Sequence, residues 1–281
     1  MASKIDLHLH TAASDGTLTP WELVAQAKAA GIGALAVTDH DTMAGVPEAI
    51  AAGVALGVQV LAGIEISTDY RGKDTHVLGY GLGPDAPALG PVLDWVQQDR
   101  RRRNIQIAER MNRDGIPVSL EQLEEQNPGA TIGRPHFARV LVAQGAANSV
   151  SDAFERFLNP GKRYYLPRTY LPMARAADII RRSGGVAVLA HPLQYGYAPE
   201  ELRRMVAYAA ELGMGGMEIY YTGYTRPQRD MLKELAAEFG LFATGGSDFH
   251  GANKPQIVLG ALEVPPECLR ALEDRLGEVG P

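Results

Sequence analysis

The sequence predicts an α/β protein that is interrupted once by a helical insertion. Three observations support this fold class: short apolar runs alternate with helix-like patterns at both ends of the chain, the alternation breaks near residue 83, and the interrupting stretch has its own charge. Alternating strands and helices are typical of βαβ units around a parallel sheet. With 281 residues, 46% of them hydrophobic and 21% charged, the chain is long enough for one large domain with an insertion.

The first third of the chain contains the expected βαβ pattern. Thr19 can cap the first helix, Pro20 suits its first turn, and Glu22 can complete a capping box. Gly31 and Gly57 are placed to end the first and second helices. The expected elements are a strand at residues 5–9, a helix at 20–30, a strand at 34–37, a helix at 47–56 and a strand at 58–66.

Residues 83–91 are expected to form a linker, because they contain two glycines and three prolines. The elements expected after it are helices at 92–113, 120–126, 135–144 and 150–157, and then strands at 186–190, 217–221 and 241–244 with helices between them. We therefore expect one α/β domain formed by residues 1–98 and 169–281, with a small helical domain inserted at 99–168.

The insertion differs from the rest of the chain in charge. Residues 100–168 include 12 basic and 7 acidic side chains, a net charge of +5, whereas the rest of the chain has 15 and 26, a net charge of −11. The total of −6 argues weakly against a general nucleic-acid coat, because affinity for polyanions comes largely from neutralising phosphates. The asymmetry suggests two parts with different roles.

Cysteine content and apolar runs bear on where the protein works. Cys268 is the single cysteine, so no intramolecular disulfide can form, and no charged segment followed by an apolar one precedes the first motif. The longest apolar runs, such as 185–190, are far shorter than the ~20 residues needed to cross a bilayer. These features predict a cytoplasmic protein with no membrane partner, and they carry no signal for an oligomeric state.

The seven histidines are the most informative residues of the sequence. His8 and His10 lie two positions apart in an expected strand, so both imidazoles face one side of it. Taken alone, such a pair could be a solvated strand face. The same residue types recur at other expected strand ends, however, namely at Asp39, His40, Asp41, Glu65, His191, Asp248 and His250.

Side chains at the carboxyl ends of parallel barrel strands converge on the face where active sites are built. Six histidines are therefore expected to meet there, since scattered core histidines would not share strand ends with Asp and Glu. Imidazole and carboxylate ligands without a thiol suit Mn, Fe, Zn or Co. Together with Asp15, Glu65 and Asp248 they are too many ligands for one ion, which implies two or three metals with Glu65 as a natural bridge.

Seven short motifs follow one another along the chain: D-x-H-x-H at residues 6–10, S-D-G at 14–16, T-D-H-D at 38–41, G-x-E at 63–65, H-x-L-G-Y at 76–80, A-H-P at 190–192 and G-S-D-F-H at 246–250. In this order they resemble the PHP (polymerase and histidinol phosphatase) family. The resemblance implies a distorted (β/α)7 barrel with a trinuclear metal centre. Residues 131–139 and 160–167 further resemble the TrpH-like bacterial members, known as 3′,5′-nucleotide bisphosphatases and as exoribonucleases acting 5′ to 3′ on short RNA.

The resemblance also implies a set of metal ligands. One metal would take His8, His10, Glu65 and Asp248, a second would share Glu65 and take His76 and His191, and a third would take Asp15, His40 and His250. Asp6, Asp39 and Asp41 have no place in this set, so we expect them to orient ligand histidines. For Asp41, a capping or purely structural role is the alternative. Mn is the expected metal, with Fe or Zn as alternatives.

The insertion offers a candidate phosphate site. Arg134 and His136 flank Pro135 at an expected helix start, where free N–H groups and the helix dipole favour an anion. The arginine adds a fork suited to phosphate oxygens. Lys162 is a further candidate. The alternatives are a surface arginine, a helix-capping histidine and a solvated lysine.

These features predict a metal-dependent phosphoesterase. A metal-bridging hydroxide held by Glu65 and the histidine ligands would attack a phosphate ester in line, while the metals offset phosphoryl charge. Arg134, His136 and Lys162 would hold a second phosphate. The expected reaction is removal of the 3′-phosphate of nucleoside 3′,5′-bisphosphates, with short 5′-phosphorylated oligoribonucleotides as further substrates and no long nucleic acid. Besides the metal ligands, no general acid is apparent.

Three alternatives stay open. A histidinol-phosphate or other small-molecule phosphatase would not need a basic insertion with a second anion site. A non-catalytic nucleotide-binding module would be expected to lack metal ligands, whereas this chain has the full set. A metal-dependent amide or ester hydrolase would have no use for the extra arginine and lysine side chains. A covalent route is disfavoured because no G-x-S-x-G motif occurs.

Overall fold

The computed structural model describes residues 4–83, 86, 88–167 and 169–278. Its strands are β1 (Lys4–Leu9), β2 (Ile32–Val37), β3 (Gln59–Tyr70), β4 (Lys73–Tyr80), β5 (Leu171–Pro172), β6 (Val186–Leu189), β7 (Gly216–Tyr221) and β8 (Phe242–Gly246). Its α-helices are α1 (Pro20–Ala29), α2 (Val46–Leu56), α3 (Gly90–Arg113), α4 (Leu120–Gln126), α5 (Arg134–Ala143), α6 (Val150–Ala153), α7 (Met173–Arg182), α8 (Pro199–Glu211), α9 (Arg226–Glu238) and α10 (Pro266–Glu278).

The strands form a nearly closed barrel. Among the described residues, seven strands follow one another in the order β1-β2-β3-β4-β6-β7-β8, and β5 pairs with β3. Backbone hydrogen bonds from His10 N to Phe249 O (3.1 Å) and from Asp248 N to His8 O (2.9 Å) join the end of β8 to β1. This approach needs glycine at position 246, where a Cβ would lie 2.3 Å from the Cβ of His8. The expected barrel class is confirmed.

The sheet departs from the expected parallel arrangement at β4. This strand pairs antiparallel with both β3 and β6, whereas the other pairs of the main path are parallel. Arg71 and Gly72, both at positive φ (52° and 78°), form the tight turn between β3 and β4. Two central residues at positive φ are the turn that joins neighbouring antiparallel strands. No crossover helix separates these two strands, so the βαβ alternation breaks before the linker.

Local helix signals are mostly as expected. The Thr19 hydroxyl accepts from Glu22 N and the Glu22 carboxylate accepts from Thr19 N, which completes the capping box of α1. Two details differ. Pro135 is the second residue of α5 rather than the first, since the helix begins at Arg134, and the expected helix at 150–157 divides into α6 and a π-helical turn at Phe154–Leu158.

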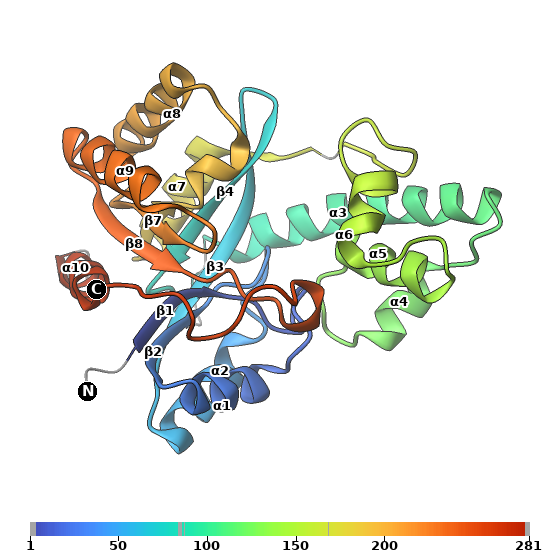
Figure 1. The fold of residues 1–281 in the computed structure, drawn as a ribbon, viewed down its shortest axis with the longest axis horizontal. Helices are drawn as coiled ribbons and strands as arrows, with labels where there is room; N and C mark the ends of the chain where they lie inside the picture. The colour runs from blue at the N-terminus through green and yellow to red at the C-terminus, as the bar shows by residue number, and fades with distance from the viewer. Residues whose placement is uncertain (1–3, 84–85, 87, 168, 279–281) are drawn as a thin grey trace.

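The helices between β4 and β5 lie to one side of the barrel, and α3 extends from the sheet out to α4, α5 and α6 (Figure 1). Buried side chains of this group, including Ile107, Met111, Phe137, Leu141 and Tyr164, form a hydrophobic cluster of their own. Helix α3 begins at Gly90 and runs through residue 98, where the sequence places a domain boundary. The other expected boundary, at 168, and residues 84, 85 and 87 of the expected linker lie outside the described residues. The domain limits therefore stay a prediction.

Helix α3 is the longest of the helices described, with 24 residues, and it carries four consecutive arginines at 100–103. Within the described ranges, no helix combines the length and the apolar character that crossing a bilayer requires.

Candidate metal centre

Six histidines and three carboxylates gather at one end of the barrel. The ends of β1, β2, β6 and β8 bring most of them there, because these strands run in the same direction. Glu65 lies within β3 and is joined by an isolated parallel bridge to His40, which follows the end of β2. His76 reaches the same place from the first half of β4, since that strand runs the opposite way.

One group consists of His8, His10, Glu65 and Asp248, whose candidate ligand atoms all lie within 4.8 Å of one another. Glu65 Oε2 is 3.3 Å from His8 Nε2 and 3.2 Å from His10 Nε2. Asp248 Oδ1 is 3.2 Å from His10 Nε2 and 3.6 Å from His8 Nε2. All four side chains are buried. This is the set of residues that the sequence assigns to one metal.

A second group shares Glu65. Its other oxygen, Oε1, lies 2.8 Å from His76 Nδ1 and 2.9 Å from His191 Nε2, and the two ring nitrogens are 3.3 Å apart. His40 Nδ1 is 3.2 Å from Glu65 Oε2. Glu65 thus stands between two groups of imidazoles and offers one oxygen to each, which is the arrangement a bridging carboxylate needs.

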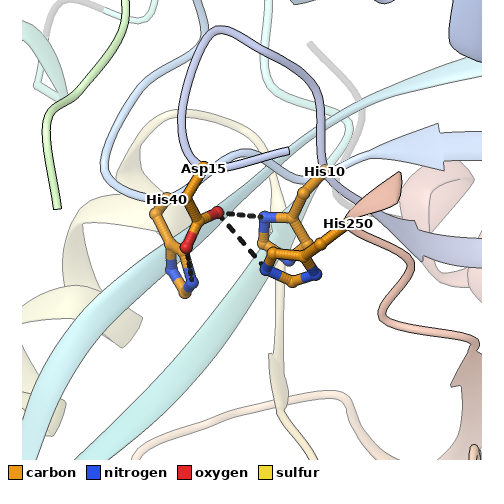
Figure 2. A group of neighbouring side chains, drawn as sticks. All are labelled: His10, Asp15, His40 and His250. Atoms are coloured by element: carbon orange, nitrogen blue, oxygen red, sulfur yellow. Dashed lines mark ion pairs between the residues drawn. The ribbon is translucent and has the colours of Figure 1, made fainter. Parts of the chain in front are cut away.

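The third group surrounds Asp15, as Figure 2 shows. Its carboxylate lies 3.3 Å from His250 Nε2, 3.7 Å from His10 Nδ1 and 3.8 Å from His40 Nε2. The sequence assigned Asp15, His40 and His250 to one metal, and the structure adds the second ring nitrogen of His10 to them.

These residues fit divalent metal ions in their donor atoms. The ring nitrogens Nδ1 of His10 and His40 are buried and make no hydrogen bond in the described structure. Buried polar atoms normally have partners, and a cation would supply one. Burial lowers the pKa of His10 and His76, but the surrounding carboxylates outweigh it and raise the two pKa values to about 9 and about 10. At these two rings the carboxylates favour positive charge, which divalent cations would provide while binding neutral imidazole. At His40, by contrast, burial lowers the pKa to about 3.

Strained backbone places several of these side chains. Asp41, His191 and Asp248 are three of the four described non-glycine residues at positive φ, with values of 54°, 23° and 57°. Such conformations cost of order 1–3 kcal/mol each and persist where the surrounding structure fixes them. Here they place His191 and Asp248 among the candidate ligands and Asp41 against Ser67 N.

The three aspartates expected to orient histidines instead hold the backbone of the ligand loops. Asp6 accepts from Ser247 N (2.8 Å), and Asp39 accepts from Thr11 N (2.8 Å) and from two hydroxyl groups. Asp41 accepts from Ser67 N (2.8 Å) and forms an ion pair with Arg100 of α3. Their described contacts are thus to backbone and side-chain donors around the ligand loops rather than to a histidine ring, and those of Asp41 agree with the structural role left open for it.

Glu218 plays the orienting role that was expected of those aspartates, and the sequence reasoning missed it. Its Oε1 lies 3.1 Å from His8 Nδ1, and its Oε2 accepts from His191 N at 2.8 Å. Two further contacts support Asp248: Tyr221 donates its hydroxyl to Oδ2 at 2.6 Å, and Lys254 Nζ is 2.6 Å from the same oxygen. The available signal was a carboxylate inside the otherwise apolar run at 217–221.

A cavity of about 670 Å³ opens onto the candidate metal centre. Its lining includes Asp15, His40, His76 and His250 of the candidate ligand set. Arg100, Arg103 and Arg134 also line it, and Val142, Val150 and Phe154 add apolar surface. The cavity thus combines metal-ligating groups, cationic groups and an apolar wall.

The three residues expected to bind a second phosphate lie in different settings. Arg134 lines the cavity, with its guanidinium 5.8 Å from the ring centre of Tyr165 and 5.9 Å from that of Phe154. His136 is 2% exposed, accepts from Gly133 N through Nδ1 (3.0 Å) and so caps α5, and burial lowers its pKa to about 4. Lys162 is exposed and lies outside the set of lining residues found in the described part of the chain. Direct contact of His136 and Lys162 with substrate stays a prediction.

Comparison with known proteins places this geometry in context. A model of the PHP domain matches residues 6–171. The 5′-3′ exoribonuclease Rnm of Escherichia coli (strain K12) is 39% identical over 249 residues, which cover 87% of this chain and 84% of that protein. The 3′,5′-nucleoside bisphosphate phosphatase of Chromobacterium violaceum is 33% identical over 280 residues, 98% of each chain.

The fold is also similar to that of a solved structure. One from Bifidobacterium adolescentis, described as a metal-dependent phosphoesterase, superposes with a TM-score of 0.87 at 33% identity and covers 98% of this chain and 97% of its own.

Proposed function

This chain belongs to the PHP domain family and is a metal-dependent phosphoesterase, and from this premise we propose that it removes the 3′-phosphate of nucleoside 3′,5′-bisphosphates. The observation that carries the proposal is one cavity that is lined both by candidate metal ligands and by Arg134. A phosphate ester at the ligands and a second phosphate at the arginine would occupy both charged groups together. A simple monoester would use one of them.

The proposed ligand sets are His8, His10, Glu65 and Asp248 for one divalent cation, Glu65, His76 and His191 for a second, and Asp15, His40 and His250 for a third. Mn²⁺ is the proposed metal, with Fe²⁺ or Zn²⁺ as alternatives. When bound, the cations supply charge that activates water and offsets the phosphoryl oxygens. Glu65 would hold two of them at a fixed spacing.

The chain's own residues would position the substrate. Arg134 can hold the 5′-phosphate through paired N–H donors, which is the geometry that arginine offers to phosphate oxygens. Val142, Val150 and Phe154 provide an apolar surface for the nucleoside. A volume of about 670 Å³ lies within the range of small-ligand sites and suits a nucleotide rather than a long polymer.

Short 5′-phosphorylated oligoribonucleotides are a second candidate substrate class. The similarity to the Escherichia coli exoribonuclease favours it, and the chemistry is the same attack on a phosphate ester. In that case the 5′-phosphate would again lie at Arg134 and the first ester bond at the candidate metal ligands. The cytoplasmic location that the sequence predicts agrees with such substrates and stays a prediction.

The experiment that tests the proposal compares three substrates on Mn²⁺-loaded protein: a nucleoside 3′,5′-bisphosphate, a 5′-phosphorylated dinucleotide and histidinol phosphate. We expect the highest kcat/KM for the bisphosphate, and inorganic phosphate with a nucleoside 5′-monophosphate as products. Preference for histidinol phosphate would overturn the proposal. A higher kcat/KM for the dinucleotide would instead assign exoribonuclease activity as the main role.

A further inference from the structure

Asp74 lies between a candidate metal ligand, His76, and Arg134. It is the second residue of β4, its side chain is 32% exposed, and it lines the cavity together with His76 and Arg134. Its Oδ1 is 3.5 Å from His76 Nε2, and its Oδ2 is 3.4 Å from a terminal nitrogen of Arg134. Tyr170, just before β5, donates its hydroxyl to Oδ2 at 2.8 Å. One carboxylate therefore touches a candidate metal ligand, the arginine of α5 and the chain that returns from the helices.

We propose that Asp74 is a positioning residue that orients His76 and holds Arg134 as a displaceable counter-ion, so that it limits how tightly the cavity retains a phosphorylated nucleotide. This inference rests on the proposed function, because it takes the anion at Arg134 to be a phosphate of the substrate or product. It assigns two effects to Asp74. The carboxylate would raise turnover by orienting His76, and it would weaken phosphate binding by pairing with Arg134.

The effect on His76 follows from the two faces of its ring. Nδ1 lies 2.8 Å from Glu65 Oε1, so Nε2 points the other way, toward Asp74. A metal-binding histidine usually donates its second ring N–H to a carboxylate, which fixes the tautomer and the ring orientation, and loss of that partner costs about 10–100-fold in metal affinity or activity. Replacing the carboxylate should therefore weaken turnover without touching the substrate directly.

The effect on Arg134 follows from charge. A phosphate that approaches the guanidinium must displace or share Asp74, and it is repelled by the same carboxylate. Part-exposed ion pairs of this kind are worth up to about 1 kcal/mol, or about fivefold in an equilibrium constant. The carboxylate thus keeps the arginine in place before substrate arrives and favours release of the 5′-phosphorylated product.

The test uses Asp74→Asn in the Mn²⁺-loaded protein, since asparagine keeps the size and an acceptor for Tyr170 but removes the charge. Binding of a nucleoside 5′-monophosphate is measured by calorimetry, and kcat and KM are measured with the 3′,5′-bisphosphate at saturating Mn²⁺. We expect the monophosphate to bind about three- to fivefold tighter, KM to fall, and kcat to fall about tenfold or more. Asp69→Asn is the matched control, because Asp69 pairs with Asp74 in the hairpin but lies outside the set of residues lining this cavity.

A second variant tests the link between the two charged groups. In the Arg134→Gln background, Asp74→Asn should tighten binding less than in the unmodified protein, because the substitution then relieves only the repulsion by the carboxylate and no longer its competition for the guanidinium. Unchanged or weaker monophosphate binding in the folded Asp74→Asn protein would overturn the inference while leaving the proposed function intact. If the unmodified protein neither binds the monophosphate nor hydrolyses the bisphosphate, the proposed function fails, and the inference fails with it.

Discussion

The ion pair between Asp41 and Arg100 joins helix α3 to the loop that carries His40, and its removal gives a prediction of definite size. Asp41 is fully buried, and its carboxylate also accepts from Ser67 N (2.8 Å) and the Ser67 hydroxyl (3.0 Å). Gln97 of the same helix donates to the Asp41 carbonyl at 3.2 Å. Arg100→Met removes the cation and leaves the carboxylate buried.

Removing one partner of a buried ion pair costs about 3–5 kcal/mol, because the remaining charge stays desolvated. The two Ser67 donors remain in this case, so we expect the lower end of that range. At about 2–4 °C per kcal/mol for a chain of roughly this size, the melting temperature should fall by about 6–12 °C. Differential scanning calorimetry measures this shift directly.

Arg101→Met is the matched control for this substitution. Arg101 is the next residue of α3, and it pairs with Glu124 at the surface with half of its side chain exposed. Such a pair is worth less than about 1 kcal/mol, so this variant should melt close to the unmodified protein. Equal melting temperatures for the two variants would refute the conclusion that the Asp41 pair fastens α3 to the ligand loop.

Three further predictions follow from individual side chains. Arg134→Ala should raise the KM for a nucleoside 3′,5′-bisphosphate about tenfold or more and that for a simple monoester much less, as steady-state kinetics with both substrates would show; equal effects would remove the second-phosphate site. Glu218→Gln should weaken Mn²⁺ binding or activity by about 10–100-fold, because His8 loses its orienting carboxylate; a Mn²⁺ titration matching that of Glu238→Gln, a surface control, would contradict it. His136 has a pKa of about 4 in the folded protein against 6.5 for an ordinary histidine, so the unfolded chain takes up the proton first and stability should fall by about 3 kcal/mol as the pH drops from about 6.5 to 4. His136→Gln keeps a capping acceptor and should flatten this part of the stability profile in urea unfolding, whereas an unchanged profile would count against a buried neutral imidazole.

The sequence predicted those parts of the fold in which local pattern and tertiary structure agree. Helix α4 occupies the predicted residues, and the capping box of α1 forms as Thr19 and Glu22 indicate. The convergence of strand ends also held, because parallel strands bring their carboxyl ends together whatever the details of packing. The six histidines expected to meet do lie together, although His76 reaches them from the antiparallel β4 and not from the end of a parallel strand.

The features that the sequence did not predict depend on partners far along the chain. The extension of β3 beyond Ile66 and the first half of β4 are polar, so no apolar run marks the hairpin. Glu218 lies within a strand rather than at its end, and its orienting role is visible only when β1 packs nearby. The role of Asp74 likewise depends on its contacts with Arg134 and Tyr170, which are 60 and 96 residues away in the sequence.

The most direct test of the assignment as a metal-dependent phosphoesterase measures both metal content and phosphate release in the unmodified protein and in Glu65→Gln. We predict that elemental analysis finds two to three divalent cations per chain in the unmodified protein and fewer in the variant, and that the variant releases no phosphate from a nucleoside 3′,5′-bisphosphate. Chelation of the unmodified protein should abolish hydrolysis, and Mn²⁺ should restore it. Full turnover by Glu65→Gln, or by chelated protein free of metal, would contradict the account.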